Sequence, residues 1–175
     1  MKPIYVLNGP NLNRLGTREP EIYGTTTLKE IEAICRKAAG KRPVEFRQSN
    51  AESQLIDWIH EAIDQGAGIV INPAGLTFTS IPIMDALKMF PGPVFELHIS
   101  NIHRREAVYH NSLMSKVATA VIAGLGPDGY RVAIEAMVRR LEGRARPVPG
   151  VSRVAARGRA RRRSPATGPA SAGSR

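Results

Sequence analysis

Short runs of apolar residues alternate with helical patterns from residue 1 to residue 142, and this alternation restricts the fold more than any other feature of the chain. Parallel strands need a crossover connection, usually a helix, between one strand and the next. Strands that are buried on both faces are continuous apolar runs. Such runs lie at residues 4–7, 44–47, 69–71, 94–98 and 117–123. The alternation therefore predicts an α/β domain built on one parallel sheet of five strands.

Motifs that begin helices lie between the predicted strands. Thr27-Leu-Lys-Glu30 and Ser49-Asn-Ala-Glu52 both have the form of a capping box, in which a hydroxyl and a glutamate bond each other's backbone amides. Pro82 and Pro127 suit the first turns of two later helices, where the amide that proline lacks would have no partner. The predicted buried positions follow helical spacing: Leu28, Ile31, Ile34, Cys35 and Ala38, then Leu55, Ile56, Ile59, Ala62 and Ile63, and finally Val132, Ile134, Ala136, Met137 and Leu141. Four helices and five strands in this order predict a flavodoxin-like, doubly wound sheet with strand order 2-1-3-4-5.

Charge is distributed unevenly along the chain. The net charge is +10, but residues 143–175 contain nine arginines and no acidic residue, so residues 1–142 hold 16 basic and 15 acidic residues. This tail, rich in Arg, Pro, Ala, Gly and Ser, has too few bulky aliphatic side chains to offset the entropy of ordering, so it is predicted to be disordered. Such a tail is usually a solvated extension. The alternative is weak contact with polyanions such as nucleic acid through Arg161, Arg162 and Arg163.

Cysteine content and hydropathy exclude several classes of protein. Cys35 is the single cysteine, so the chain has no disulfide framework and no paired-cysteine redox or zinc site. No run of about 18 apolar residues is present, and no charged-then-apolar signal segment opens the chain. These features predict a cytoplasmic protein without membrane contact, in which Cys35 belongs to the core.

Polar residues follow three of the predicted strands. Residues 8–24 follow the first strand, residues 72–75 follow the third, and residues 96–101 end the fourth. Because ligands bind beyond the carboxyl ends of the strands in open α/β sheets, these three clusters are predicted to share one rim. Residues 8–24 show neither a helix nor a strand pattern. So long a connection in a compact domain is usually functional, which predicts a lid.

Tyr23 and His98 are the candidate base and acid of this rim. A phenol has a reference pKa of about 10 and is a poor base at neutral pH, but a guanidinium from Arg18 or Arg14 favours the phenolate. Glu96 and His98 are two apart on a strand and point to the same face, where the carboxylate orients the imidazole or favours its protonated form. The alternatives are a tyrosine that packs the end of the loop and a histidine satisfied by backbone.

Two further patterns carry less weight. Residues 124–129 have the form Gly-x-Gly-x-x-Gly, but they follow the last predicted strand and contain Pro127, which has no amide for a phosphate. A tight turn into the last helix explains these glycines. His60, His103 and His110 have no cysteine or carboxylate at metal-ligand spacing, so the sequence predicts no metal and no cofactor.

Residues 3–142 resemble the type II 3-dehydroquinate dehydratases, a family of small flavodoxin-like enzymes. The resemblance rests on LNGPNLNRLGTREPEIYG at residues 7–24, QSNAE and LIDWIH at 48–52 and 55–60, INPAG at 71–75 and ELHISNIH at 96–103. It implies a trans elimination of water from 3-dehydroquinate, a cyclic β-hydroxy ketone carboxylate, through an enolate and without metal or cofactor. The pathway would be the shikimate pathway of aromatic amino acid biosynthesis or quinate metabolism. The resemblance also implies trimers that assemble into dodecamers.

The resemblance assigns roles to most polar residues of the rim. It implies that Tyr23 removes the proton α to the carbonyl, that Arg18 holds Tyr23 as phenolate, and that His98 protonates the departing hydroxyl. It also implies that Asn11 holds a water against the enolate oxygen and that Asn72 and Glu96 position His98 or the substrate. The Ile99 and Ser100 amides and the Ser100 hydroxyl would bind the substrate carboxylate. Arg14 and Arg105 would contact the substrate.

Two substrate-binding positions depart from the family pattern. Phe78 replaces the histidine of a Thr-His-Thr-Ser motif, and Tyr109 replaces an arginine four residues after Arg105. In the family, that histidine and arginine bind ring hydroxyls together with an aspartate from a neighbouring subunit, which is present here as Asp85. Phe78 has no hydrogen-bonding group and Tyr109 has no charge. Each unpaired hydroxyl costs about 1–3 kcal/mol, so turnover of 3-dehydroquinate is predicted to be weak or lost.

These departures leave two alternatives to a standard dehydratase. The first is a repurposed enzyme with the same acid and base that acts on a less hydroxylated or aromatic cyclic carboxylate. The second is a non-catalytic scaffold or polyanion-binding protein that uses the basic tail, because a fold does not by itself imply a function.

Overall fold

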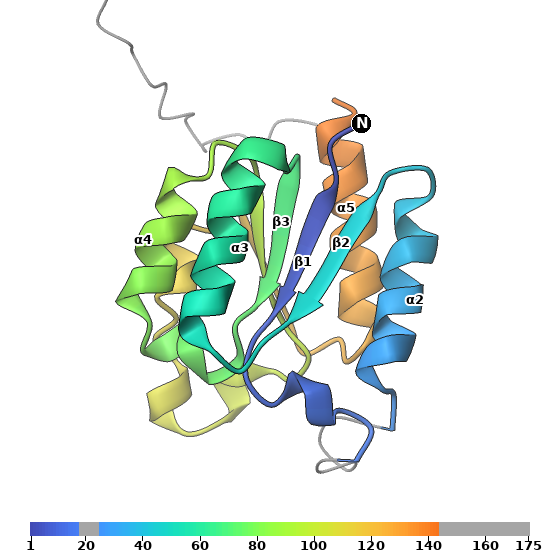
Figure 1. Ribbon diagram of the computed structural model, residues 1–175. Coiled ribbons are helices and arrows are strands. Elements are labelled where there is room, and N and C mark those ends of the chain that lie inside the picture. The colour runs from blue at the N-terminus through green and yellow to red at the C-terminus, as the bar shows by residue number, and fades with distance from the viewer. Residues whose placement is uncertain (18–24, 144–175) are drawn as a thin grey trace, which may run out of the picture.

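The structure is a computed structural model that describes residues 1–17 and 25–143, in which one sheet lies between two layers of helices (Figure 1). The sheet has five parallel strands in the order β2-β1-β3-β4-β5. Their bounds are Ile4–Asn8 for β1, Val44–Gln48 for β2, Gly68–Asn72 for β3, Val94–His98 for β4 and Ala120–Ala123 for β5. The predicted flavodoxin-like strand order is confirmed.

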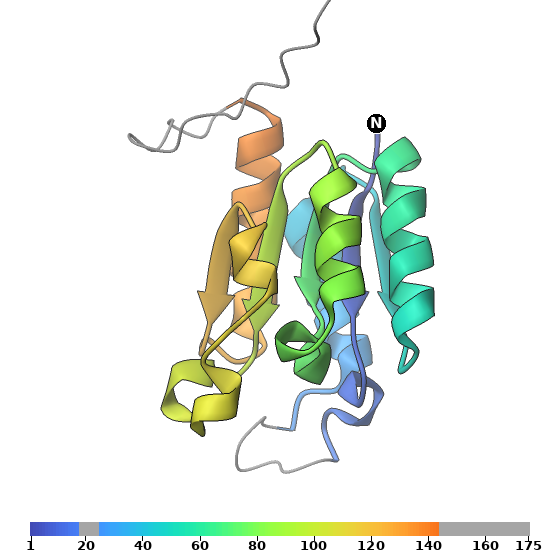
Figure 2. The ribbon, with the colours of Figure 1, turned by 90° about the vertical axis from the view of Figure 1, so that its left-hand side faces the viewer.

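Two helices cover each face of the sheet. Helices α2 (Leu28–Ala39) and α5 (Asp128–Leu141) pack together on one face, and α3 (Glu52–Gln65) and α4 (Ile81–Met89) pack together on the other (Figure 2). Short 3₁₀ helices occupy the connections: η1 at Leu12–Arg14, η2 at Ala74–Phe78, η3 at Ile102–Arg104, η4 at Ala107–Tyr109 and η5 at Met114–Lys116.

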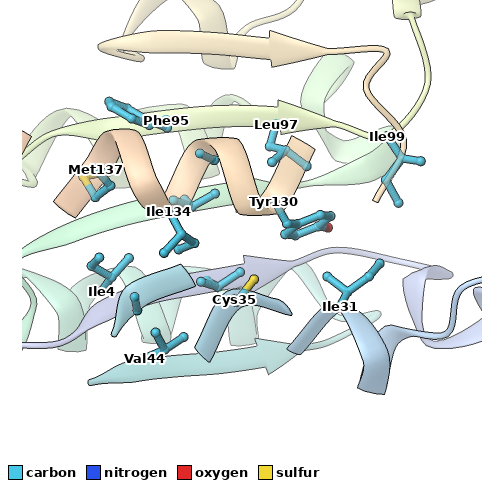
Figure 3. Close-up of a cluster of buried hydrophobic side chains, with 14 of the residues drawn as sticks. Ile4, Ile31, Cys35, Val44, Phe95, Leu97, Ile99, Tyr130, Ile134 and Met137 are labelled. Atoms are coloured by element: carbon cyan, nitrogen blue, oxygen red, sulfur yellow. The ribbon is translucent and has the colours of Figure 1, made fainter. Parts of the chain in front are cut away.

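Each strand contributes to two core clusters because its side chains alternate between the two faces of the sheet. In β1, Ile4 and Val6 pack toward α2 and α5, in the cluster that Figure 3 shows. Tyr5 and Leu7 pack on the opposite side, against residues of α3 and α4. Each face of the sheet is therefore covered by its own apolar cluster. Polar residues lie at the carboxyl ends of the strands.

Strand β5 begins three residues later than the sequence predicted. The predicted start at Val117 is wrong, because Val117 ends the η5 turn: its amide donates to the Met114 carbonyl at 3.0 Å. The Val117 side chain still packs against the α3 and α4 cluster. Val117 and Ala118 are apolar although they precede the strand, and a short apolar run does not distinguish a strand from such a segment.

One of the two predicted capping boxes is present. The Thr27 hydroxyl accepts from the Glu30 amide at 3.3 Å, and Glu30 Oε2 accepts from the Thr27 amide at 2.7 Å. The second prediction is wrong, because helix α3 begins at Glu52 with Ala51 as its cap. Ser49 instead accepts the Ala51 amide at 3.0 Å, within a turn that precedes the helix. Glu52 is therefore the first residue of the helix and cannot be the third residue of a capping box.

The buried face of α5 is rotated relative to the prediction. Tyr130 and Ala133 are fully buried together with Ile134 and Met137, whereas the predicted Val132 and Ala136 are only partly buried. Residues 130, 133, 134 and 137 follow the i, i+3, i+4, i+7 spacing of one helix face. Smaller shifts occur in α2, where Ala39 is buried and the predicted Leu28, Ile34 and Ala38 are partly buried. Pro127 is the cap of α5 and Pro82 lies in the first turn of α4, behind a Ser80 cap.

The glycines of residues 124–129 form the predicted turn between β5 and α5. Gly124 and Gly126 have φ angles of 85° and 60°, in the region that favours glycine. Their amides donate to the carbonyls of His98 and Ile99 at 3.2 and 3.0 Å. The turn therefore supports the end of β4 through its backbone.

Cys35 is fully buried in the α2 and α5 cluster, as predicted. Burial raises the pKa of the Cys35 thiol to about 12, with a smaller contribution from Glu32. The thiolate is the reactive form, and an ordinary thiol has a pKa of about 8.5. At pH 8 we expect Cys35 of the native protein to react with Ellman's reagent about a thousandfold more slowly than Cys35 in denaturant. Equal rates in the two conditions would contradict the buried position.

No helix within the two described ranges is long and apolar enough to cross a bilayer. Helix α5 ends at Leu141, one residue before the predicted domain boundary. The predicted tail, including Arg161, Arg162 and Arg163, falls from residue 144 onward outside the described residues.

Candidate active site

A cavity of about 250 Å³ lies at the carboxyl edge of the sheet. Three strands supply polar residues to its lining: Asn11 follows β1, Asn72 ends β3 and His98 ends β4. The other lining residues are Pro10, Leu12, Leu15, Ala74, Gly75, Phe78, Ile99, Ser100, Ile102, Arg105 and Tyr109. The three polar clusters that were predicted to share one rim therefore lie around one cavity.

Glu96 and His98 are in direct contact, as their spacing on β4 predicted. His98 Nε2 lies 2.7 Å from Glu96 Oε1, and the two side chains are 5% and 0% exposed. Because Glu96 binds Nε2, the other ring nitrogen of His98, Nδ1, remains for a ligand in the cavity. A carboxylate accepts hydrogen bonds only, so the imidazole carries a proton on Nε2 and donates it to Glu96 Oε1.

Glu96 is a carboxylate although it is completely buried. Burial raises the pKa of the Glu96 carboxyl, but hydrogen bonds from His98, Ser112 and Ser115 outweigh burial and hold that pKa below its usual value. The Ser112 hydroxyl donates to Oε1 at 2.6 Å and the Ser115 hydroxyl to Oε2 at 2.5 Å. Sequence reasoning missed both serines, because they lie in an irregular segment without a periodic pattern.

Asn72 is held in place by the buried Tyr130. Asn72 Nδ2 donates to the Tyr130 hydroxyl oxygen at 3.0 Å, and that hydroxyl donates to Asn8 Oδ1 at 2.7 Å. Asn72 Oδ1 accepts from the Ala74 amide at 3.3 Å. Burial raises the pKa of the Tyr130 phenol above its usual value, so Tyr130 remains a protonated donor. The network joins the ends of β1 and β3 beneath the cavity.

Asn11 and Arg14 lie in the connection that follows β1. Asn11 has a φ angle of 68°, a left-handed conformation that asparagine tolerates better than most residues, and its amide donates to Asn50 Oδ1 at 2.9 Å. Arg14 is exposed in η1 and is not among the residues that line the cavity. Its contact with substrate stays a prediction.

Phe78, Tyr109 and Arg105 form one side of the cavity, which we call the aromatic wall. The Phe78 and Tyr109 rings meet edge to face, with centroids 5.3 Å apart. The guanidinium carbon of Arg105 lies 3.9 Å from the centre of the Tyr109 ring, at the distance of a cation–π contact. Phe78 also lies nearly parallel to the His98 imidazole, at 6.2 Å. The two positions that depart from the family pattern therefore contact each other, and Phe78 adjoins the candidate acid.

The remaining predicted site residues lie away from the cavity or outside the described residues. Asp85 is on α4 with a side chain that is 60% exposed, and it forms an ion pair with Lys88 at 2.8 Å. It does not line this cavity, and its contribution to a neighbouring subunit stays a prediction. Arg18 and Tyr23 fall in residues 18–24, outside the described residues, so the roles of base and base partner also stay predictions.

Residues 1–17 and 25–143 contain no group of three or more His, Cys, Asp or Glu that is arranged to hold a metal ion.

A family model described as class II dehydroquinase matches residues 2–138. This chain belongs to the class II dehydroquinase family. It is 55% identical over 143 residues to the 3-dehydroquinate dehydratase of Chelativorans sp. (strain BNC1), covering 80% of this chain and 99% of that protein. It is also 55% identical to the 3-dehydroquinate dehydratase of Streptomyces avermitilis, covering 82% and 92% of the two chains.

Solved structures of class II dehydroquinases share the fold. The type II dehydroquinase of Propionibacterium acnes superposes with a TM-score of 0.76 at 45% identity, covering 79% of this chain and 97% of that chain. A 3-dehydroquinate dehydratase-like protein from Bifidobacterium longum superposes with a TM-score of 0.59 at 33% identity, covering 82% and 99%. The sheet and the cavity at its carboxyl edge are therefore built on the class II dehydroquinase fold.

Proposed function

We propose that this class II dehydroquinase is a 3-dehydroquinate dehydratase, a carbon–oxygen lyase that eliminates water from 3-dehydroquinate to give 3-dehydroshikimate. The observation that carries the proposal is the buried Glu96–His98 pair, whose Nε2–Oε1 distance is 2.7 Å and whose imidazole lines the cavity. Relatives at 53–57% identity carry the name of this activity, which supports the same reaction here.

His98 is the general acid of the proposed reaction. Its Nδ1 proton passes to the hydroxyl that leaves the ring, so that the carbon–oxygen bond breaks with release of water rather than hydroxide. Glu96 accepts a hydrogen bond from the Nε2–H group of His98, and its charge stabilises the imidazolium until the Nδ1 proton is transferred. A carboxylate held by three donors keeps its charge, so it supports the acid without taking its proton. A proton from solvent restores His98 after each turnover.

Tyr23 is the proposed base, and Arg18 is its proposed cationic partner. The phenolate oxygen takes the proton α to the ketone, and the electron pair of the carbon–hydrogen bond moves into the enolate. Asn11 holds a water against the enolate oxygen. When the enolate collapses, the carbon–oxygen bond breaks and the conjugated enone forms. The tyrosine proton then returns to solvent.

The loop after β4 is the proposed carboxylate site. Ile99 and Ser100 line the cavity directly after His98. Their amides and the Ser100 hydroxyl bind the substrate carboxylate, while Asn72 and Arg105 contact other polar groups of the ring. The hydrogen bonds of Asn72 to Tyr130 and Ala74 support this role, because they limit the rotation of the Asn72 side chain.

A second candidate function rests on the aromatic wall. Phe78 presents an apolar ring 6.2 Å from His98, and Arg105 is stacked on Tyr109. Neither ring supplies the histidine or arginine donor that binds substrate hydroxyls in the family pattern. The second proposal is therefore a lyase with the same acid and base that acts on a cyclic β-hydroxy ketone carboxylate with fewer ring hydroxyls or an aromatic substituent.

One experiment compares the two candidates. The full chain is mixed separately with 3-dehydroquinate and with an analogue that lacks the ring hydroxyls not eliminated in the reaction, and enone formation is followed by ultraviolet absorbance. A higher kcat/KM for 3-dehydroquinate supports the first function. A kcat/KM for the analogue at least tenfold higher than for 3-dehydroquinate supports the second. No enone from either compound contradicts both.

The proposal extends to location and assembly. We place the enzyme in the cytoplasm, where it acts on a small cyclic carboxylate. It forms a homo-oligomer, either a trimer or a dodecamer built from trimers, in which Asp85 reaches the cavity of a neighbouring subunit. Sedimentation equilibrium tests the assembly, and a monomer at micromolar concentration would contradict it.

A further inference from the structure

The segment between β4 and β5 returns to the strand that it leaves. Residues 99–119 run through η3, η4 and η5, and they place Ser112 and Ser115 against Glu96 in the middle of β4. Glu96 precedes these serines by 16 and 19 residues. The contact therefore depends on how the whole segment packs and not on a local turn.

The hydrogen bonds around the Glu96 carboxylate have an assignable direction, because a carboxylate accepts hydrogen bonds only. The Ser112 hydroxyl oxygen accepts the Ser115 amide at 3.0 Å, so its single proton is free to point to Glu96 Oε1, 2.6 Å away. The Ser115 hydroxyl donates to Oε2. His98 adds a third donor, on Oε1. Charge-assisted hydrogen bonds of this kind are about twice as strong as neutral ones. Three donors thus hold both oxygens of a carboxylate that has no exposure to water.

We infer that Ser112 and Ser115 are positioning residues for His98: they hold Glu96 as an ionised, fixed acceptor, and thereby keep the Nδ1 atom of His98 directed to the cavity. The expected effect on catalysis rests on the proposed function. The effect of the two serines on the ionisation and position of Glu96 does not depend on that function. Neither serine lines the cavity. They act through Glu96 and not on substrate.

The same segment connects the serines to the aromatic wall. Leu113, which follows Ser112, donates its amide to the Thr77 carbonyl at 3.0 Å, and Thr77 precedes Phe78. Arg105 and Tyr109 lie earlier in the segment and line the cavity. Because the Leu113 anchor uses backbone atoms, serine substitutions leave it in place. Loss of a hydroxyl therefore alters the Glu96–His98 pair without removing the wall that contacts substrate.

The test compares four variants of the full chain: Ser112→Ala, Ser115→Ala, the double variant, and Ser115→Thr, which retains a hydroxyl. Ser53→Ala, an exposed position on α3, is the matched control. Steady-state kinetics give kcat and KM, and isotope-edited infrared spectroscopy follows protonation of the Glu96 carboxyl, with Glu96→Gln identifying its band. Circular dichroism checks that each variant is folded.

We expect kcat of the double variant to fall about tenfold to a hundredfold, with KM within about twofold of the unmodified chain, because hydrogen bonds to a charged group are lost. The Glu96 carboxyl is expected to become protonated at higher pH in each alanine variant, and Ser115→Thr is expected to behave like the unmodified chain. Because the infrared titration needs no turnover, it decides the inference even if the protein does not act on 3-dehydroquinate.

Two results would overturn the inference. One is a Glu96 titration in the folded alanine variants that matches the Ser53→Ala control. The other, in an active enzyme, is a kcat that equals that of the control. If the double variant fails to fold, Ser115→Ala and Ser115→Thr carry the comparison, because Ser115 is an exposed residue and not part of the apolar core.

Discussion

Replacing His98 with glutamine is expected to lower kcat by about 10² to 10⁴, which is the usual contribution of a general acid. Glutamine is similar in length and can still hydrogen-bond Glu96, but it has no proton to give to a departing hydroxyl. KM is expected to change little, because His98 acts on the leaving group and the proposed carboxylate site lies at Ile99 and Ser100. Enone formation from the preferred substrate measures both constants.

His60→Gln is the matched control for this substitution. His60 is exposed on α3, which lies on the face of the sheet opposite α2, and it does not line the cavity. Its kcat should equal that of the unmodified chain. If His98→Gln kept the kcat of the His60→Gln control, the acid role of His98 would be wrong. Tyr23→Phe provides the corresponding test of the base, since phenylalanine cannot accept the α proton.

The double substitution Phe78→His with Tyr109→Arg is expected to raise kcat/KM for 3-dehydroquinate by about tenfold to ten-thousandfold. Phe78→His supplies a hydrogen-bonding group where phenylalanine has none, and Tyr109→Arg replaces a neutral phenol with a charged guanidinium that has several donors. An unpaired ring hydroxyl costs about 1–3 kcal/mol. Because Phe78 contacts Tyr109 at 5.3 Å, the two effects are not expected to add, and each single variant must be measured as well. Steady-state kinetics on all three variants give the coupling.

Phe78→Leu with Tyr109→Leu is the control, because it removes both rings without adding a donor. If the leucine variant gained as much activity as the histidine and arginine variant, the restored hydrogen bonds would not be the cause. If neither variant changed kcat/KM, the aromatic wall would have no part in substrate selection. The second candidate function would then lose its structural support.

Much of the fold was predictable because local sequence patterns repeat with the periods of regular structure. Apolar runs and helical spacing predicted five parallel strands and four helices in the observed order. The Thr27 and Glu30 capping box was also predictable, since its partners are three residues apart. The Glu96–His98 contact follows from the two-residue period of a strand, which places both side chains on the same face.

The errors occurred where local patterns were ambiguous. Ser49 forms a turn rather than a helix cap, and the apolar residue Val117 ends a 3₁₀ turn rather than beginning β5. In α5 the prediction omitted Tyr130, whose ring is buried and whose hydroxyl bonds Asn72. A tyrosine on a helix can be buried or exposed, depending on whether its hydroxyl finds a hydrogen-bond partner in the interior. The partners of Tyr130, Asn72 and Asn8, are distant in the chain.

The order of the elements, the rim that Asn72 and His98 share, and the pairing of His98 with Glu96 could be read from the amino-acid sequence. Each depends on residues that are close in the chain or on the shared direction of parallel strands. The contacts of Ser112 and Ser115 with Glu96, and of Phe78 with Tyr109, became visible only in the folded chain. These contacts join segments without a repeating pattern. Their partners are brought together by the packing of the whole chain, which no local spacing encodes.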